Sequence, residues 1–143
     1  MKLKALVVDD SKVMRAMIMQ ALAKAHLGEF EFVEASDGLE ALGRFNLAET
    51  DICFVDWNMP NMNGLEFVRQ VRSITVDPIP VVMITSERTM GKMEQALNEA
   101  GATAYICKPF TAEELRYKLA HIVEGIRARK ATHKSSFFSR LFG

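Results

Sequence analysis

Five short apolar runs alternate along this chain with longer segments in which apolar residues recur at three- and four-residue intervals. The runs are residues 5–8, 32–35, 52–55, 81–84 and 104–107. Apolar runs of about four residues are typical of parallel strands that are covered on both faces. Five strands alternating with five helices predict a doubly wound α/β fold, in which helices lie on both faces of a five-stranded parallel sheet.

The expected helices carry start and stop signals. Three of them begin with a capping side chain three residues before a glutamate, which is the spacing of a capping box. Gly101 is expected to end the fourth helix, near residues 90–100, as a left-handed C-cap. The three capping pairs are Asp37 with Glu40, Asn63 with Glu66, and Thr111 with Glu114.

Apolar spacing also predicts which faces of the first and last helices are buried. The first helix, about residues 12–25, is expected to bury a stripe made of Val13, Ala16, Met17 and Ala21. The stripe of the last helix consists of Leu115, Leu119, Ile122 and Ile126.

The chain has 143 residues with 18 basic and 18 acidic side chains, so its formal net charge is zero. This length suits one domain with at most a tail, and the charge excludes a uniformly basic nucleic-acid binder. Cys53 and Cys107 lie inside apolar runs, which predicts buried thiols in a reducing cytoplasm. We recognise no signal peptide and no apolar run of the roughly 20 residues that a membrane span requires.

Polar side chains follow four of the predicted strands: Asp9 and Asp10, then Asp56, Thr85 and Lys108. Right-handed crossovers place the ends of all parallel strands at one edge of the sheet, where such folds bind ligands. Three carboxylates crowded there would repel one another unless a cation neutralised them, and Mg²⁺ suits oxygen ligands of this kind. A single aspartate after a strand is more often a helix cap, but five such residues at one edge are hard to explain that way.

This set of groups predicts phosphoryl transfer to a carboxylate. Asp56 is the best candidate nucleophile because it stands alone at the end of a central strand. Lys108 would compensate the negative charge of the phosphoryl group, and Thr85 would offer a hydroxyl donor.

Four separated motifs resemble the receiver domain of two-component response regulators. The resemblance covers about residues 3–126 and implies a flavodoxin-like (βα)5 fold with strand order 2-1-3-4-5, so that residues 1–126 form the receiver domain. It also implies a cis bond between Lys108 and Pro109. The motifs are VVDDS at 7–11, DWNMPNMNGLE at 56–66, ITS at 84–86 and KPF at 108–110.

By this resemblance Asp56 is the residue phosphorylated by a histidine kinase. Asp10 and Asp56 would ligate Mg²⁺ together with the backbone carbonyl of Asn58, and Asp9 would support the ion through water. The family therefore implies one cofactor, Mg²⁺, and no enzymatic turnover beyond self-phosphorylation and slow autodephosphorylation.

The same resemblance implies a phosphorylation switch. Thr85 and Lys108 would contact the phosphoryl group, and Tyr105 would be the aromatic switch residue that turns inward when Thr85 moves. Asn58 and Glu87 occupy the positions that tune the dephosphorylation rate in the family.

The resulting interpretation is a single-domain response regulator, of the chemotaxis type, that signals by phosphorylation-dependent protein contact. Its downstream target would bind the face formed by the fourth helix, fifth strand and fifth helix. The flagellar motor switch is one candidate, although residues 88–92 depart from the basic pattern of chemotaxis members. Two alternatives remain: a phosphocarrier in a relay, and a Mg²⁺-dependent aspartyl-phosphate phosphatase. The phosphatase is disfavoured because no second acid follows Asp56 closely.

Residues 127–143, called the tail below, are basic and aromatic. Because five of the 18 basic side chains and none of the 18 acidic ones lie in the tail, residues 1–126 carry a formal net charge of −5. Three interpretations stay open: a frayed and disordered end, a helical motif that docks on a partner or on the chain's own body, and attachment to a membrane surface. The apolar residues of the motif are Phe137, Phe138, Leu141 and Phe142.

Trp57, beside the candidate nucleophile, also has two interpretations. It is either a contact for a partner or an ordinary exposed aromatic side chain of a loop.

Overall fold

The computed structural model describes residues 2–75 and 79–142, and for residues 135–138 it describes the backbone without the side chains. In this part of the chain, five parallel strands form one sheet in the order β2-β1-β3-β4-β5, which confirms the predicted fold and strand order. The strands are β1 (Leu3–Val8), β2 (Phe30–Ala35), β3 (Ile52–Val55), β4 (Val81–Thr85) and β5 (Ala104–Cys107).

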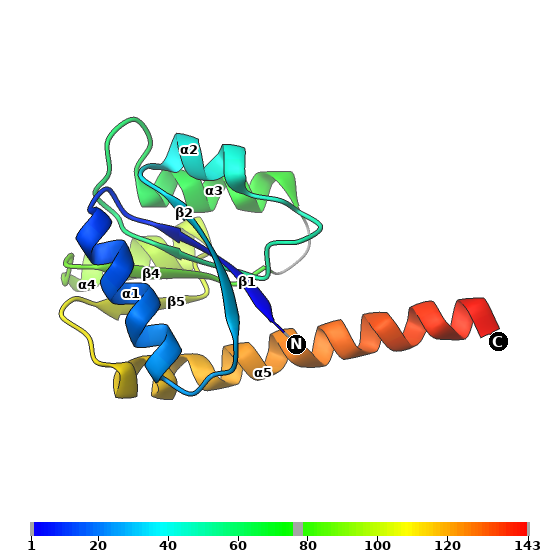
Figure 1. Cartoon of the computed structure of the whole chain (residues 1–143). Helices are drawn as coiled ribbons and strands as arrows, with labels where there is room; N and C mark the ends of the chain where they lie inside the picture. Colours follow the sequence, from blue (N-terminus) through cyan, green and yellow to red (C-terminus); the bar gives the residue numbers. More distant parts are fainter. Residues whose placement is uncertain (1, 76–78, 143) are drawn as a thin grey trace.

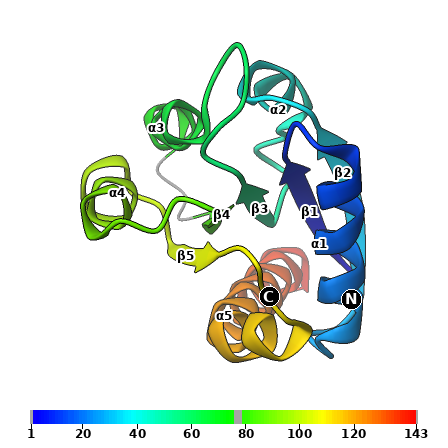
Figure 2. The ribbon, with the colours of Figure 1, turned by 90° about the vertical axis from the view of Figure 1, so that its left-hand side faces the viewer.

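Helices cover both faces of the sheet. Helices α1 and α5 lie on one face, and α2, α3 and α4 lie on the other (Figures 1 and 2). Their bounds are α1 (Lys12–Lys24), α2 (Gly38–Arg44), α3 (Gly64–Ile74), α4 (Met90–Glu94), the π-helical segment η1 (Gln95–Ala100) and α5 (Ala112–Phe142).

The three predicted N-cap hydrogen bonds form. The side chains of Asp37 and Asn63 accept hydrogen bonds from the third residue of α2 and α3. The hydroxyl of Thr111 accepts from the amide of Glu114 at 3.1 Å, at the start of α5. Gly101 ends the fourth helical segment with a φ of +93°, the left-handed conformation expected of it.

The core consists of two apolar layers, one on each face of the sheet. Successive strand residues alternate between the layers because the side-chain period of a strand is two. Val7 and Phe54 pack toward α1 and α5, whereas Leu6 and Cys53 pack on the opposite side. The strands are thus buried on both faces, which explains their continuous apolar runs.

The predicted buried face of α1 is wrong. Val13 is 71% exposed and Met17 is 51% exposed, and the buried residues of the helix are Ile18 and Leu22. Apolar side chains occur on all sides of this helix, so their spacing fits two stripes. Packing against β1, β2 and α5 decides between them, and those contacts have no local signature.

The helix expected near residues 90–100 is not uniform. Its first part, α4, is α-helical, and its second part, η1, has π-helical hydrogen bonding. The first part follows the loop after β4, at the edge that carries the polar residues, whereas η1 leads into the start of β5 at the opposite edge.

Helix α5 continues through the tail to Phe142. The structure therefore shows a helix where the sequence also allowed a disordered end. Two contacts tie the first turns of the tail to the body. The Arg127 guanidinium donates to the carbonyl of Leu27 at 2.8 Å, and the Lys130 ammonium lies 2.9 Å from the Asp51 carboxylate. None of the helices in the described residues is long and apolar enough to cross a bilayer.

Burial makes the Cys53 thiol a testable feature of the core. Its side chain is fully buried, and burial raises the pKa of the thiol to about 12. In a Cys107→Ser variant, which keeps Cys53 alone, we expect no reaction with a thiol reagent at neutral pH until the chain is unfolded. A colorimetric thiol assay with and without denaturant measures this, and rapid reaction in the native state would contradict the placement of Cys53.

Candidate functional site

Three carboxylates meet at the carboxyl edge of the sheet. Asp9 and Asp10 follow β1 and Asp56 follows β3; one oxygen of each lies within 4.8 Å of the others. The Asp56 amide donates to the Val8 carbonyl at 3.0 Å, which extends the pairing of the two strands as far as the cluster. Asp9 is 1% exposed and Asp56 is 9% exposed, whereas Asp10 is exposed.

Lys108 reaches into this cluster from the end of β5. Its ammonium lies 2.7 Å from Asp9 Oδ2 and 3.2 Å from Asp56 Oδ2. Burial opposes the charge of Lys108, but its hydrogen bond with Asp9 and the negative charges of Asp56 and Asp9 outweigh burial and raise its pKa. Its amide donates to the Thr85 carbonyl at 2.8 Å, and the bond to Pro109 is cis, as expected. Lys108 thus stands as a cation between two buried acids.

The loop after Asp56 folds back tightly on the site. The Trp57 amide donates to Asp56 Oδ1 at 2.7 Å, and the Trp57 carbonyl accepts from the Gly64 amide at 2.9 Å. A Cβ atom on Gly64 would lie 2.0 Å from the backbone oxygen of Asp56, so only glycine fits there. The loop therefore holds one oxygen of the Asp56 carboxylate and packs against the Asp56 backbone.

Trp57 is not the exposed aromatic that one interpretation expected. Its side chain is 6% exposed and belongs to the apolar layer under α3 and η1. The Lys92 ammonium lies 4.7 Å from the ring centroid, within reach of a cation–π interaction. The sequence motif could not show this burial, because the loop covers the indole only after it has folded back on α3.

Glu87 connects the remaining candidate residues. Its amide donates to Thr85 Oγ1 at 3.3 Å, its carboxylate accepts from Asn58 Nδ2 at 2.8 Å, and its carbonyl accepts from the Tyr105 hydroxyl at 2.7 Å. Thr85 is fully buried, and Tyr105 is 5% exposed. Burial, followed by the neighbouring Cys107, Glu87 and Asp56, raises the pKa of Tyr105 to about 12. Tyr105 thus lies inward, with its hydroxyl protonated at neutral pH.

The sequence analysis missed two residues that support the site. The Ser11 amide donates to Asp9 Oδ1 at 2.9 Å while the Ser11 hydroxyl caps α1. The Arg88 guanidinium donates to the carbonyl of Lys108. Ser11 could have been found from the sequence, because it directly follows Asp9 and Asp10 and precedes a helix. Arg88 could not, because its hydrogen-bond partner Lys108 lies 20 positions away.

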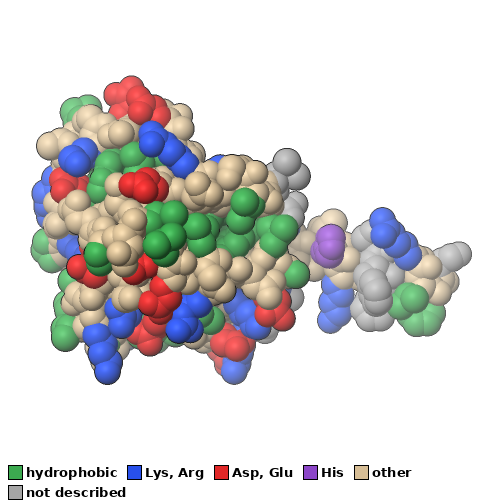
Figure 3. All heavy atoms as spheres, turned by 90° about the horizontal axis from the view of Figure 1, so that it is seen from above, with side chains coloured by type: hydrophobic (Ala, Val, Ile, Leu, Met, Phe, Trp, Pro, Cys, Tyr) green, Lys and Arg blue, Asp and Glu red, His purple; other side chains and the backbone are tan. Residues whose placement is uncertain are grey.

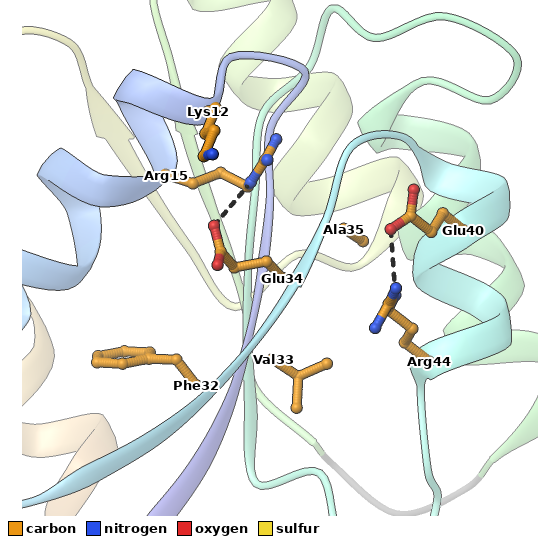
Figure 4. A pocket seen from close by; sticks show the side chains of 8 residues that line it. All are labelled: Lys12, Arg15, Phe32, Val33, Glu34, Ala35, Glu40 and Arg44. Carbon is orange, nitrogen blue, oxygen red and sulfur yellow. Dashed lines mark hydrogen bonds and ion pairs between the residues drawn. The ribbon is translucent and has the colours of Figure 1, made fainter.

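A separate hollow of about 440 Å³ lies beside β2, between α1 and α2. Four of its charged side chains form ion pairs: Arg15 with Glu34 at 3.0 Å, and Arg44 with Glu40 at 3.1 Å (Figure 4). None of the clustered carboxylates lines it. The hollow is therefore not part of the acidic site.

These observations define the class of the protein. It is a doubly wound α/β domain with an acidic site at the carboxyl edge of its sheet, the edge that faces the viewer in Figure 2. Clustered carboxylate oxygens suit a hard divalent cation, and a neighbouring ammonium suits an anionic ligand.

The comparisons with known proteins place it within this class. The model of the response regulator receiver domain matches residues 5–120. Chemotaxis protein CheY1 of Helicobacter pylori is 44% identical over 119 residues, which make up 82% of this chain and 94% of that protein. A chemotaxis protein CheY homolog of Campylobacter jejuni is 40% identical over 123 residues, or 85% of this chain and 92% of the homolog.

A solved structure agrees with these relatives. Vibrio cholerae chemotaxis protein CheY4 has a TM-score of 0.73 and 37% identity, and the match covers 85% of this chain and 98% of that one. The chain therefore belongs to the response regulator receiver domain family. The family match ends at residue 120, before the tail begins.

Proposed function

We propose that this response regulator is switched by phosphorylation of Asp56 and signals by contact with a protein target. The observation that carries the proposal is the meeting of three carboxylates with the Lys108 ammonium at the edge where open α/β sheets bind ligands. The donor is a histidine kinase, and the setting is a chemotaxis-type system in the cytoplasm, in line with the names of the relatives.

The transfer forms a bond between a carboxylate oxygen of Asp56 and phosphorus, while the bond from phosphorus to the donor nitrogen breaks. Lys108 compensates the charge of the transferred group from its position beside Asp56. Thr85 offers its hydroxyl to the phosphoryl oxygens. Asp9 holds the Lys108 ammonium at 2.7 Å and thereby keeps it aimed at the site.

The residues present fit a magnesium ion. Asp10 and Asp56 would hold the ion through carboxylate oxygens. By the family resemblance, the backbone carbonyl of Asn58 would be a further ligand and Asp9 would support the ion indirectly. Both oxygens of Asp9 already accept hydrogen bonds, from Ser11 and Lys108, which agrees with such an indirect role. Bound Mg²⁺ supplies positive charge that offsets the repulsion between the carboxylates and the incoming phosphate.

Glu87 transmits the conformational effect of phosphorylation from Thr85 to Tyr105. It contacts Thr85, Asn58 and Tyr105, so a movement of Thr85 toward a phosphoryl group pulls on the backbone that holds the Tyr105 hydroxyl. By the family resemblance, Asn58 and Glu87, which are joined by a hydrogen bond of 2.8 Å, also tune the rate of dephosphorylation. The switch changes the populations of two arrangements of this loop.

The downstream target binds the face formed by α4, β5 and α5. Met90 of α4 is 85% exposed and Tyr117 of α5 is 87% exposed, so these two helices offer large side chains with apolar area to a partner. Measuring the affinity of the phosphorylated chain for the flagellar motor switch tests whether the switch is that partner.

The proposal is tested by incubating the chain with Mg²⁺ and a small acyl phosphate and measuring its intact mass. We expect one phosphoryl adduct per chain, released slowly. Many equivalents of hydrolysed phosphomonoester would instead indicate the phosphatase. Passage of the phosphoryl group from the chain to a histidine of a second protein would indicate the relay carrier.

Magnesium binding is expected to depend on Asp10. Trp57 is the only tryptophan of the chain and its amide contacts Asp56, so its fluorescence should respond to Mg²⁺. In Asp10→Asn we expect the affinity for Mg²⁺ to fall at least about tenfold, because one anionic ligand is lost. Fluorescence titration measures this. Glu124→Gln, which removes an exposed charge from α5, is the matched control and should titrate like the wild type.

A further inference from the structure

The last three turns of α5 project away from the rest of the molecule. Arg127 and Lys130 hold the base of the tail against Leu27 and Asp51. Beyond Lys130 the helix extends into solvent (Figure 1). Residues 131–142, the projecting segment, are about 18 Å long at the rise of an α-helix. The end of the helix is therefore placed where it can contact a surface outside the chain's own body.

The projecting segment combines positive charge with exposed apolar side chains. Lys134 and Arg140 are its lysine and arginine, and it has no acidic residue. Leu141 is 59% exposed and Phe142 is 81% exposed at its far end. Figure 3 shows the cations and an apolar group along this helix, clear of the body.

We propose that the projecting segment binds the surface of an anionic lipid bilayer. Cations are attracted to anionic headgroups, and aromatic and leucine side chains enter the boundary between headgroups and acyl chains. A lipid surface satisfies both requirements without a shaped groove. No helix of the described residues can span a bilayer, so the segment lies on the membrane and not across it.

Two other occupants fit the observations less well. The chain's own body is out of reach, because the contacts of Arg127 and Lys130 direct the helix away from it. A second copy would offer an acidic body, with a formal net charge of −5 over residues 1–126, but that charge does not by itself supply an apolar layer beside it. A lipid surface presents anionic groups and an apolar layer together, which matches the cations and the apolar end of the segment.

The test is co-sedimentation of the purified full chain with vesicles of phosphatidylcholine alone or mixed with phosphatidylglycerol. We expect binding to the mixed vesicles only. Lys134→Gln combined with Arg140→Gln should weaken that binding about 30-fold, at about 1 kcal/mol for each cation near the surface. Leu141→Ser combined with Phe142→Ser should weaken it at least about tenfold, because apolar area no longer enters the lipid.

Matched controls separate this proposal from its rivals. Arg116→Gln combined with Tyr117→Ser removes one cation and one exposed aromatic from the part of α5 on the body, and it should bind vesicles like the wild type. Asp56→Asn should also bind normally, so the proposal does not depend on phosphorylation. Absence of binding to the mixed vesicles would overturn it. So would a wild-type dimer in analytical ultracentrifugation that the Leu141 and Phe142 variant converts to a monomer, because a second copy would then be the occupant.

Discussion

Replacing Asp56 with asparagine is expected to abolish the phosphoryl adduct that the wild-type chain forms with Mg²⁺ and a small acyl phosphate. The amide of asparagine is almost the same size as the carboxylate but is not a competent nucleophile under these conditions. Because Asp56 is anchored by the Trp57 amide and faces Lys108, no other carboxylate has the same pair of contacts among the described residues. Intact mass spectrometry measures the adduct directly.

The control for this experiment is Asp51→Asn. Asp51 precedes β3, whereas Asp56 follows it, so the two aspartates lie at opposite edges of the sheet. The control should keep the full adduct. An adduct that persists at another residue in Asp56→Asn would show that the assignment of the phosphoacceptor is wrong.

Replacing Gly64 with alanine is expected to lower the free energy of unfolding by about 3 kcal/mol or more, at the upper end of the cost of overpacking. The new Cβ would lie 2.0 Å from the backbone oxygen of Asp56, and neither backbone segment can move without disturbing the other. The Gly64 amide also donates to the Trp57 carbonyl, so the loop that presents Asp56 would shift. Denaturation in urea measures the loss of stability.

A second glycine provides the matched control. Gly125 lies inside α5, and nothing stands within 4 Å of the position of its Cβ. Gly125→Ala should raise the stability by about 0.5–1 kcal/mol, because alanine loses less backbone entropy in a helix. If both variants unfolded at the same urea concentration, the predicted loss of stability from the close approach of Gly64 to Asp56 would be wrong.

The fold could be predicted from the sequence because its signals are local. Each strand is a short apolar run, and Asp37, Asn63 and Thr111 mark helix starts within three residues of their partners. The position of the site follows from topology, since parallel strands that alternate with helices must end at one edge. Asp9, Asp56 and Lys108 therefore could be expected to lie near one another before any coordinates were known.

What could not be predicted depends on contacts between distant segments. The buried face of α1 is selected by packing against β1, β2 and α5, and Trp57 is buried in the layer that α3 and η1 form. The pairing of Lys130 with Asp51 joins residues 79 positions apart. Spacing rules describe one element at a time, so they give no information on such pairs.

The unbroken course of α5 fixes a rotational relation between the two ends of the molecule. The helix starts beside Lys108, runs back along the sheet and leaves at the opposite edge, so its two ends are the ends of one rod about 46 Å long. Each residue added or removed after Lys130 would turn everything beyond it by about 100° and shift it by about 1.5 Å. A one-residue deletion there would therefore point Leu141 and Phe142 in a new direction relative to Asp56, whereas a deletion of seven residues, close to two full turns, would nearly restore the original phase.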